Sequence, residues 1–472
     1  MNTKAKTFLK NFSHTFAANA VTFLISALVV LVVPKRLGGD QYGYFQLYTL
    51  YTSYVGFFHF GWCDGMYLRY GGKDYHQLDK PVFVTQFWML AGLELLISIG
   101  LGIYGFLVVP EADKGLILAM TGVCALLVIP RTYLAYVLQF TNRIKEYASI
   151  TMLERVLYFV LVVAMLAVGV RDYRMLIAAD LIGKAAALMV AVVRCRDIVF
   201  GRLVPLKPAW QETREDIGVG FKLMFANIAS LLIVGIVRLS IEGQWDVETF
   251  GKVSLTLSVS NLLMVFISAV SLILFPTLRR TDESKLAGMY TLMRTCIMAG
   301  LLGMLIFYYP AKVILAAWLP KYADALTYMA LMFPLCVFES KTSMLVTTYL
   351  KILRKEKWIL LINVSTVALS VVTTAITVFW LQNLTLAVLS IVVLQSFRCI
   401  FGELLLSRSL DIAVKKDIVL EVAMTAIFIS VSWFIRSWWC MALYALAYLG
   451  YLLIKRRDLK EMLHQVKSLV KR

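Results

Sequence analysis

Apolar residues run along this chain in long stretches, and short segments rich in polar and charged residues separate them. A helix that crosses a lipid bilayer needs about 20 mostly apolar residues. Two places are weaker than the rest, because 323–350 contains Glu339 and Lys341 and the closing pair of stretches is short. The pattern predicts fourteen membrane-spanning helices, with twelve as the alternative count. They are placed at 14–34, 43–63, 82–109, 115–140, 149–170, 175–194, 217–238, 253–276, 288–310, 323–350, 358–381, 384–407, 418–435 and 438–454.

These stretches have the pattern of helices and not of membrane β-strands. A membrane strand alternates polar and apolar residues over about ten positions, and neither Leu24–Val33 nor Leu262–Phe275 does so. Composition agrees, since 60% of the 472 residues are hydrophobic, 16% are charged, and the mean hydropathy is +0.77. We therefore expect an all-α polytopic membrane protein with almost no chain left for a soluble catalytic domain.

Lysine and arginine gather in every second connection between the stretches. Roughly thirty basic residues lie on one side and roughly nine on the other, a bias that places the basic side in the cytoplasm. Both termini then lie in the cytoplasm. The net charge of +18 is thus mainly a signal of topology, and we expect no nucleic-acid partner.

A weak repeat divides the chain. Within residues 16–45 and 225–253, aligning Asn19 with Asn227 also aligns Gly43 with Gly251, each preceded by an aromatic residue, without a gap. Six spans separate the copies, so both point the same way, which predicts two six-helix bundles related by an axis along the membrane normal. Chance similarity between apolar helices is the alternative. The expected parts are an N-terminal bundle (1–194), a basic cytoplasmic connection (195–216), a C-terminal bundle (217–410), two extra spans (411–455) and a basic amphipathic tail (456–472).

Two ionisable side chains lie deep in predicted spans, where such groups usually face a partner or a cavity. Glu94 is near the middle of its span, and Lys184 is near the middle of another, one turn after Asp180. Each lies on a stripe of small residues typical of a helix face inside a bundle. A functional role is one interpretation. In the other, Lys184 pairs with Asp180, and Glu94 is protonated or bonded to a neighbour.

Two motifs resemble those of a transporter family. Residues 37–45, LGGDQYGYF, and 60–70, FGWCDGMYLRY, are similar to sequences of the polysaccharide-transport branch of the multidrug/oligosaccharidyl-lipid/polysaccharide exporter superfamily, which includes O-antigen and capsule repeat-unit flippases. The resemblance implies two bundles forming a V around a central cavity. It also implies a flippase in the bacterial cytoplasmic (inner) membrane that moves a lipid-linked oligosaccharide to the outer leaflet by alternating access. Membrane lipids and other polysaccharide-assembly proteins would be its partners.

Such a cargo carries an anionic polyprenyl-pyrophosphate, which arginine and lysine bind in a low-dielectric pocket. Arg294 and Arg398 lie within about ten residues of a cytoplasmic helix end, so snorkelling or structural pairing is their alternative role. Arg69 could equally be a cation that only sets topology. The substrate-binding candidates are Lys184, Arg69, Arg398 and Arg294; the coupling candidates are Glu94 and Asp180; the polar cavity-wall candidates are Asn19, Asn227 and Asn261.

No nucleotide-binding G-x-x-x-x-G-K-[ST] sequence is present, so ATP is not the expected direct energy source. We expect a transporter and not an enzyme, with no catalytic residue, metal or cofactor. A drug or small-cation exporter of the same superfamily is the first alternative. A membrane glycan polymerase or ligase is less favoured, because its catalytic groups need a large external loop and every external connection here is short. A non-transporting scaffold is the last.

Overall fold

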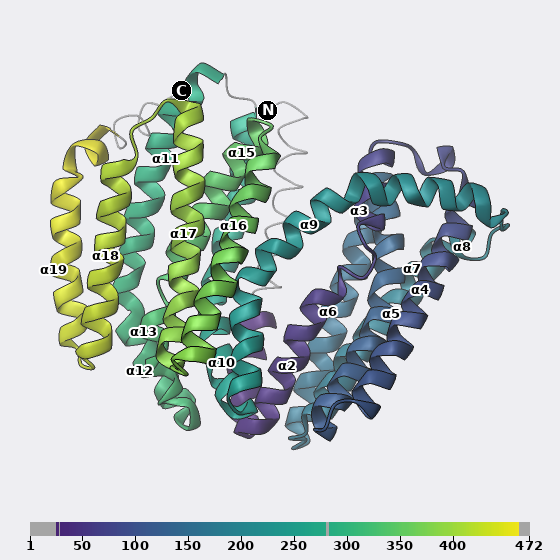
Figure 1. Ribbon diagram of the computed structural model, residues 1–472, viewed down its shortest axis with the longest axis horizontal. Helices are drawn as coiled ribbons and strands as arrows, with labels where there is room; N and C mark the ends of the chain where they lie inside the picture. The colour runs from purple at the N-terminus through teal and green to yellow at the C-terminus, as the bar shows by residue number, and fades with distance from the viewer. Residues whose placement is uncertain (1–24, 28, 280–282, 462–472) are drawn as a thin grey trace. The chain divides into compact units, whose positions relative to one another are not determined.

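The computed structural model describes residues 25–27, 29–279 and 283–461 (Figure 1). Within these ranges the regular structure is helical and there is no β-strand. The chain divides into two compact units, Leu24–Ile228 and the part from Ala229 onward, and the boundary falls inside one helix, α9 (Leu206–Gln244). The domain limits expected from the sequence remain predictions.

The first unit is built around two long helices, α4 (Lys80–Leu107) and α5 (Ala112–Phe140). They approach closely where glycines face each other, since a Cβ added at Gly105 would lie 2.5 Å from the carbonyl oxygen of Gly115. Helix α5 also packs against α2 and α7. The remaining elements of the unit are α2 (Gly39–Val55), α3 (Trp62–Tyr70), η1 (Tyr75–Gln77), α6 (Ile144–Ala167), α7 (Tyr173–Arg194), α8 (Arg196–Val199) and the start of α9.

The stretch 43–63, expected to form one span, is broken in the structure. Helix α2 ends at Val55, α3 begins at Trp62, and the backbone between them has φ values of +51° at Phe60 and +84° at Gly61. Glycine adopts such values without a Cβ penalty. The break also lets the start of α3 lie directly against α9, because a Cβ at Gly61 would be 2.7 Å from the backbone nitrogen of Phe221.

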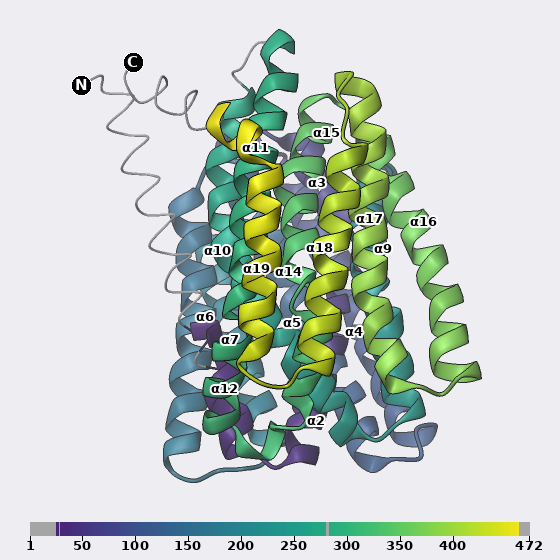
Figure 2. The ribbon, with the colours of Figure 1, turned by 90° about the vertical axis from the view of Figure 1, so that its left-hand side faces the viewer.

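The second unit contains the end of α9 and the later helices, seen from two sides in Figures 1 and 2. Helices α18 and α19 form a contacting pair. The elements in chain order are α10 (Val247–Arg279), α11 (Glu283–Met304), η2 (Leu305–Phe307), α12 (Tyr308–Trp318), η3 (Pro320–Tyr322), η4 (Ala325–Thr327), α13 (Met329–Met332), α14 (Leu335–Lys341), η5 (Thr342–Thr347), α15 (Thr348–Ile352), α16 (Glu356–Thr374), η6 (Ala375–Trp380), α17 (Leu384–Leu410), α18 (Lys415–Phe434) and α19 (Trp439–Ile454).

The interrupted stretch 323–350 forms the buried centre of this unit. In the helical segment Ala325–Ile352, 89% of the most apolar window is buried inside the protein. Short helices and the π-helical turn η5 follow one another along it. Within this segment Lys341 is buried and Glu339 is partly buried, so both charged side chains interrupt the apolar pattern inside the helical packing.

Ten helices in the described part of the chain are long and apolar enough to cross a membrane, and α19 is a shorter apolar helix. Each predicted span from 43–63 onward coincides with a helix or a broken helix. Most of the first predicted span, 14–34, and most of the predicted tail, 456–472, lie outside the described residues. The protein is a multi-pass membrane protein; the count of fourteen and the repeat remain predictions.

Candidate functional site

Glu94 lies within α4 and is fully buried. Neither of its carboxyl oxygens has a hydrogen-bond partner in the described structure. One turn further along α4, Ser98 contacts α5 so closely that a Cβ added at Gly122 would lie 2.9 Å from the Ser98 carbonyl oxygen. A buried carboxylate ion without a partner is costly. Glu94 therefore makes no hydrogen bond that would stabilise the packing of α4, so helix packing does not explain why an acid occupies this position.

Lys184 and Asp180 form an ion pair on α7, one helical turn apart. The hydroxyl of Tyr48 on α2 donates to Oδ2 of Asp180 at 2.6 Å, and Lys184 Nζ lies 5.7 Å from the centre of the Tyr48 ring. A second ion pair, Arg131 with Glu154, joins α5 to α6. The structure thus contains the ion pair between Lys184 and Asp180 that one interpretation of the sequence expected. The side chains of both residues are nevertheless partly exposed.

Arg69 is held by three carboxylates at the start of α9. Its Nη1 lies 2.6 Å from Asp216 Oδ1, and its Nη2 lies 2.9 Å from Glu212 Oε2 and 2.5 Å from Glu215 Oε2. Gln86 of α4 donates to the other Asp216 oxygen at 3.0 Å. The arginine therefore fixes α3 to α9. The sequence showed three acids close together, Glu212, Glu215 and Asp216, but gave no indication that they bind Arg69.

Arg294 belongs to a buried ionic network, which joins Arg294, Lys341, Glu403, Asp417 and Glu421 from α11, α14, α17 and α18. Arg294 Nε donates to Glu403 Oε1 at 2.6 Å and Nη1 to Asp417 Oδ2 at 2.8 Å. Its Nη2 lies 2.7 Å from Glu421 Oε1, at ion-pair distance but outside hydrogen-bond geometry.

Lys341 lies between the two glutamates of the network. Its Nζ donates to Glu403 and, at 2.6 Å, to Oε2 of Glu421. Lys341 is 1% exposed and Glu403 is 0% exposed. The cations of the network are thus surrounded by acids that the sequence analysis did not single out. Glu403 and Glu421 were visible as charged residues within the predicted spans 384–407 and 418–435, and Asp417 directly precedes the second of these.

Arg398 on α17 has neutral hydrogen-bond partners. Its Nε donates to Asn363 Oδ1 at 3.0 Å and its Nη2 to Ser230 Oγ at 2.7 Å. Glu339 interacts with it electrostatically, but no carboxylate of the described residues lies within ion-pair distance. Arg398 is only half-buried. Among the four cationic candidates, it is the one without an ion-pair partner in the described part of the chain.

The polar cavity-wall candidates are placed in part. Asn227 on α9 and Asn261 on α10 are exposed, whereas Asn19 lies outside the described residues. Within the described ranges no group of three or more histidine, cysteine, aspartate or glutamate side chains could hold a metal ion. The roles assigned to the candidate residues remain predictions.

No protein-family model matches the chain, and no curated protein matches it. Solved structures do. The lipid II flippase MurJ in an inward closed conformation aligns over 93% of this chain and 99% of its own, with a TM-score of 0.63 and 11% identity. A multidrug resistance MATE family transporter of the MOP superfamily, facing inward, aligns over 82% of this chain and 94% of its own, with a TM-score of 0.61 and 13% identity.

A third similar structure is a MOP superfamily transporter from Pyrococcus furiosus with a binding pocket of reverse polarity. It aligns over 84% of this chain and 93% of its own, with a TM-score of 0.52 and 14% identity. At such low identity these similarities establish the fold alone. The chain has the fold of MOP-superfamily transporters, and the expected all-α polytopic fold class is confirmed.

Proposed function

We propose that this protein flips a lipid-linked oligosaccharide from the cytoplasmic to the outer leaflet by alternating access, without hydrolysing ATP. The observation that carries the proposal is the near full-length similarity to a lipid II flippase, at a TM-score of 0.63 over 99% of that chain. The motifs at 37–45 and 60–70 support the same direction. The setting is the bacterial cytoplasmic membrane, with both termini in the cytoplasm and other polysaccharide-assembly proteins as partners.

In this proposal Arg398 of the second unit and Lys184 of the first unit are the two cationic substrate-binding residues, each suited to an anionic pyrophosphate. Arg398 is suited to the role because its two observed partners, Asn363 and Ser230, are neutral and leave its charge uncompensated by an ion pair. Lys184 is balanced only by Asp180 and is partly exposed. The other two candidates, Arg69 and Arg294, are each bound by three carboxylates, so a structural role accounts for them.

Glu94 and Asp180 are the coupling residues of the proposal. A carboxyl that is stable inside the protein only as the neutral acid, and ionises when water reaches it, carries one proton from one state to the other. Glu94 fits this description best because it is fully buried and its oxygens have no hydrogen-bond partner in the described structure. A proton gradient is then the driving force.

A second candidate function is export of a drug or small cation. It is favoured by the similarity to the MATE family transporter, at a TM-score of 0.61. An exporter of cations would use Glu94 and Asp180 as binding groups, and loss of Arg398 would affect it little. The two functions therefore differ in which charge they need.

The deciding experiment measures the lipid-linked intermediate on each leaflet in cells that lack the protein. Wild type is expected to clear the intermediate from the cytoplasmic leaflet. Arg398→Gln and Lys184→Ala are expected to clear it at least about tenfold more slowly, because charge-assisted bonds to phosphate are lost. The exposed Arg171 provides the matched control, Arg171→Gln.

Three results would contradict the proposal. Repeat units that reach the outer leaflet but stay unpolymerised would indicate a polymerase or ligase. No change on either leaflet would favour drug export. Full activity of both variants would remove the headgroup role of Arg398 and Lys184.

A further inference from the structure

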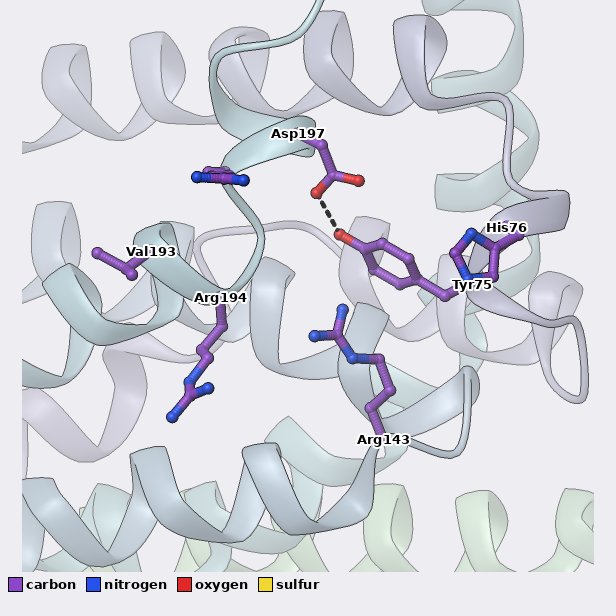
Figure 3. A pocket seen from close by; sticks show the side chains of 7 residues that line it. Tyr75, His76, Arg143, Val193, Arg194 and Asp197 are labelled. Carbon is purple, nitrogen blue, oxygen red and sulfur yellow. Dashed lines mark hydrogen bonds between the residues drawn. The ribbon is translucent and has the colours of Figure 1, made fainter.

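A pocket opens in the first unit where α6 begins and α7 ends (Figure 3). Its volume is about 520 Å³. Five of its seven lining residues are basic or acidic: His76, Arg143, Arg194, Arg196 and Asp197. By the distribution of basic loops, this end of the helices faces the cytoplasm.

Two of the charges in the pocket have partners. Asp197 accepts a hydrogen bond from the Tyr75 hydroxyl at 2.6 Å, drawn in Figure 3, and forms an ion pair with Lys80 at 2.7 Å. Arg143 donates to both oxygens of Glu146, at 2.7 and 2.6 Å, and its guanidinium lies 4.4 Å from the centre of the Tyr75 ring. These contacts form a neutral, ordered wall.

The other two arginines are not balanced in this way. Arg194 closes α7 and Arg196 opens α8; both are exposed, and no described carboxylate lies within ion-pair distance of either. The pocket therefore carries an excess of two positive charges beside its neutral wall. Guanidinium groups bind phosphate oxygens in a bidentate manner, so the chemistry of the site suits a phosphate-bearing ligand.

An apolar border distinguishes a lipid from a soluble phosphate. Val193 lines the pocket and is 70% exposed. Ile144, next to Arg143 in the chain, and Phe200, three residues after Asp197, are 49% and 73% exposed. Val193 and Ile144 lie at the ends of the candidate membrane spans α7 and α6, and Phe200 follows α8. Basic groups between helix ends, bordered by exposed apolar residues, match the two parts of a phospholipid.

We propose that this pocket binds the phosphate-bearing headgroup of a resident anionic phospholipid, with Arg194 and Arg196 holding the phosphate oxygens against the wall formed by Tyr75 and Arg143. The site is separate from the transport proposal, since neither arginine is among the groups assigned to the cargo. The phospholipid anchors the ends of α6, α7 and α8 to the leaflet.

The test measures lipid binding to the purified full-length protein in detergent by native mass spectrometry. Phosphatidylglycerol and phosphatidylcholine are titrated separately, with pyrophosphate as a soluble competitor. Arg194→Gln combined with Arg196→Gln is expected to weaken phosphatidylglycerol binding about tenfold or more and to leave phosphatidylcholine unchanged. The matched controls are Arg171→Gln, at the opposite end of α6 and α7, and Lys145→Gln, an exposed residue beside the pocket that does not line it.

The proposal is overturned if wild type binds both lipids equally, or if the double variant binds phosphatidylglycerol as the controls do. It is also overturned if pyrophosphate displaces the lipid at equal concentration, which would make a free phosphate compound the ligand. Gel filtration and thermal unfolding in phosphatidylcholine show whether the double variant is folded. Should it fail to fold, the single variants and the lipid preference of wild type decide.

Discussion

Glu94 differs from the other intramembrane acids discussed above because its buried carboxyl group has no hydrogen-bond partner in the described structure. Asp180, Glu403 and Glu421 each face a cation, whereas the Glu94 oxygens have no hydrogen-bond partner in the described structure. A group of this kind has little to contribute to stability and much to contribute to proton transfer. Replacing Glu94 by glutamine, its neutral isostere, separates the effect on stability from the effect on proton transfer.

Glu94→Gln is expected to leave thermal stability unchanged within about 1 kcal/mol, because a buried glutamine replaces the neutral acid at similar volume. Transport by the variant should lose its dependence on a proton gradient. The measurement is uptake of labelled substrate into proteoliposomes at several pH gradients. A variant whose pH dependence matches wild type would remove Glu94 from the coupling mechanism.

For the buried ionic network, in contrast to Glu94, we expect a substitution to lower stability strongly. Arg294→Met removes one cation and leaves Glu403 and Glu421 with Lys341 alone, which should cost about 3–5 kcal/mol of unfolding free energy. The matched control is Lys252→Gln, because the partly exposed pair of Lys252 with Glu248 is worth at most about 0.5 kcal/mol. Denaturant unfolding in detergent micelles measures both. Equal losses would show that burial of the network adds nothing.

At the scale of elements, the sequence predicted the helices well and their interruptions poorly. A helix that crosses lipid needs a long run of apolar residues, and such runs are visible in the sequence. Helices α4 to α7 and α16 to α19 therefore lie where the pattern predicted them. The break between α2 and α3 occurs where Gly61 contacts α9, which lies far along the chain. The sequence did not predict the ion-pair partners of Arg69 and Arg294 either, because the spacing of residues along one helix does not show which helix faces it.

The contact between α3 and α9 is tight enough to test with a single methyl group. A Cβ at Gly65 would lie 1.7 Å from the carbonyl oxygen of Asp216, so Gly65→Ala must separate the helices and loosen the contacts of Arg69. We expect a loss of about 3 kcal/mol or more. Gly100→Ala in α4, where nothing lies within 4 Å, should be neutral or stabilising by up to about 1 kcal/mol. Thermal unfolding compares the two.

The contact between η1 and α8 predicts an acid limit to stability. Burial raises the pKa of Asp197, but the bonds from Lys80 and Tyr75 outweigh it and hold the pKa below its usual range. The depressed folded-state pKa gives stability that is present above the unfolded value, about 4, and lost as pH falls through the folded value. Asp197→Asn should therefore unfold at a lower temperature than wild type at pH 7. That difference should shrink below about pH 4 and would contradict the argument if it persisted.

At the scale of the whole molecule, orientation is the most accessible prediction. The basic loops place Lys145 in the cytoplasm and Arg171, at the other end of α6, outside. In a background carrying Cys296→Ser, because Cys296 is the exposed cysteine of the described residues, Arg171→Cys should react with an impermeant maleimide in intact cells. Lys145→Cys should react only after the membrane is opened. If Lys145→Cys reacts in intact cells and Arg171→Cys does not, the protein has the opposite orientation, and the proposed direction of transport is wrong.

The buried ionic network also has a consequence for how the protein is made. Arg294 and Lys341 leave the ribosome before α18, and Glu421 follows Arg294 by more than a hundred residues, about ten seconds at usual rates of synthesis. During that interval two cations have entered the membrane with an incomplete set of partners. A chain that stops after α17 keeps Arg294, Lys341 and Glu403 but lacks Asp417 and Glu421, so we expect its unpaired charge to be recognised by quality-control proteases.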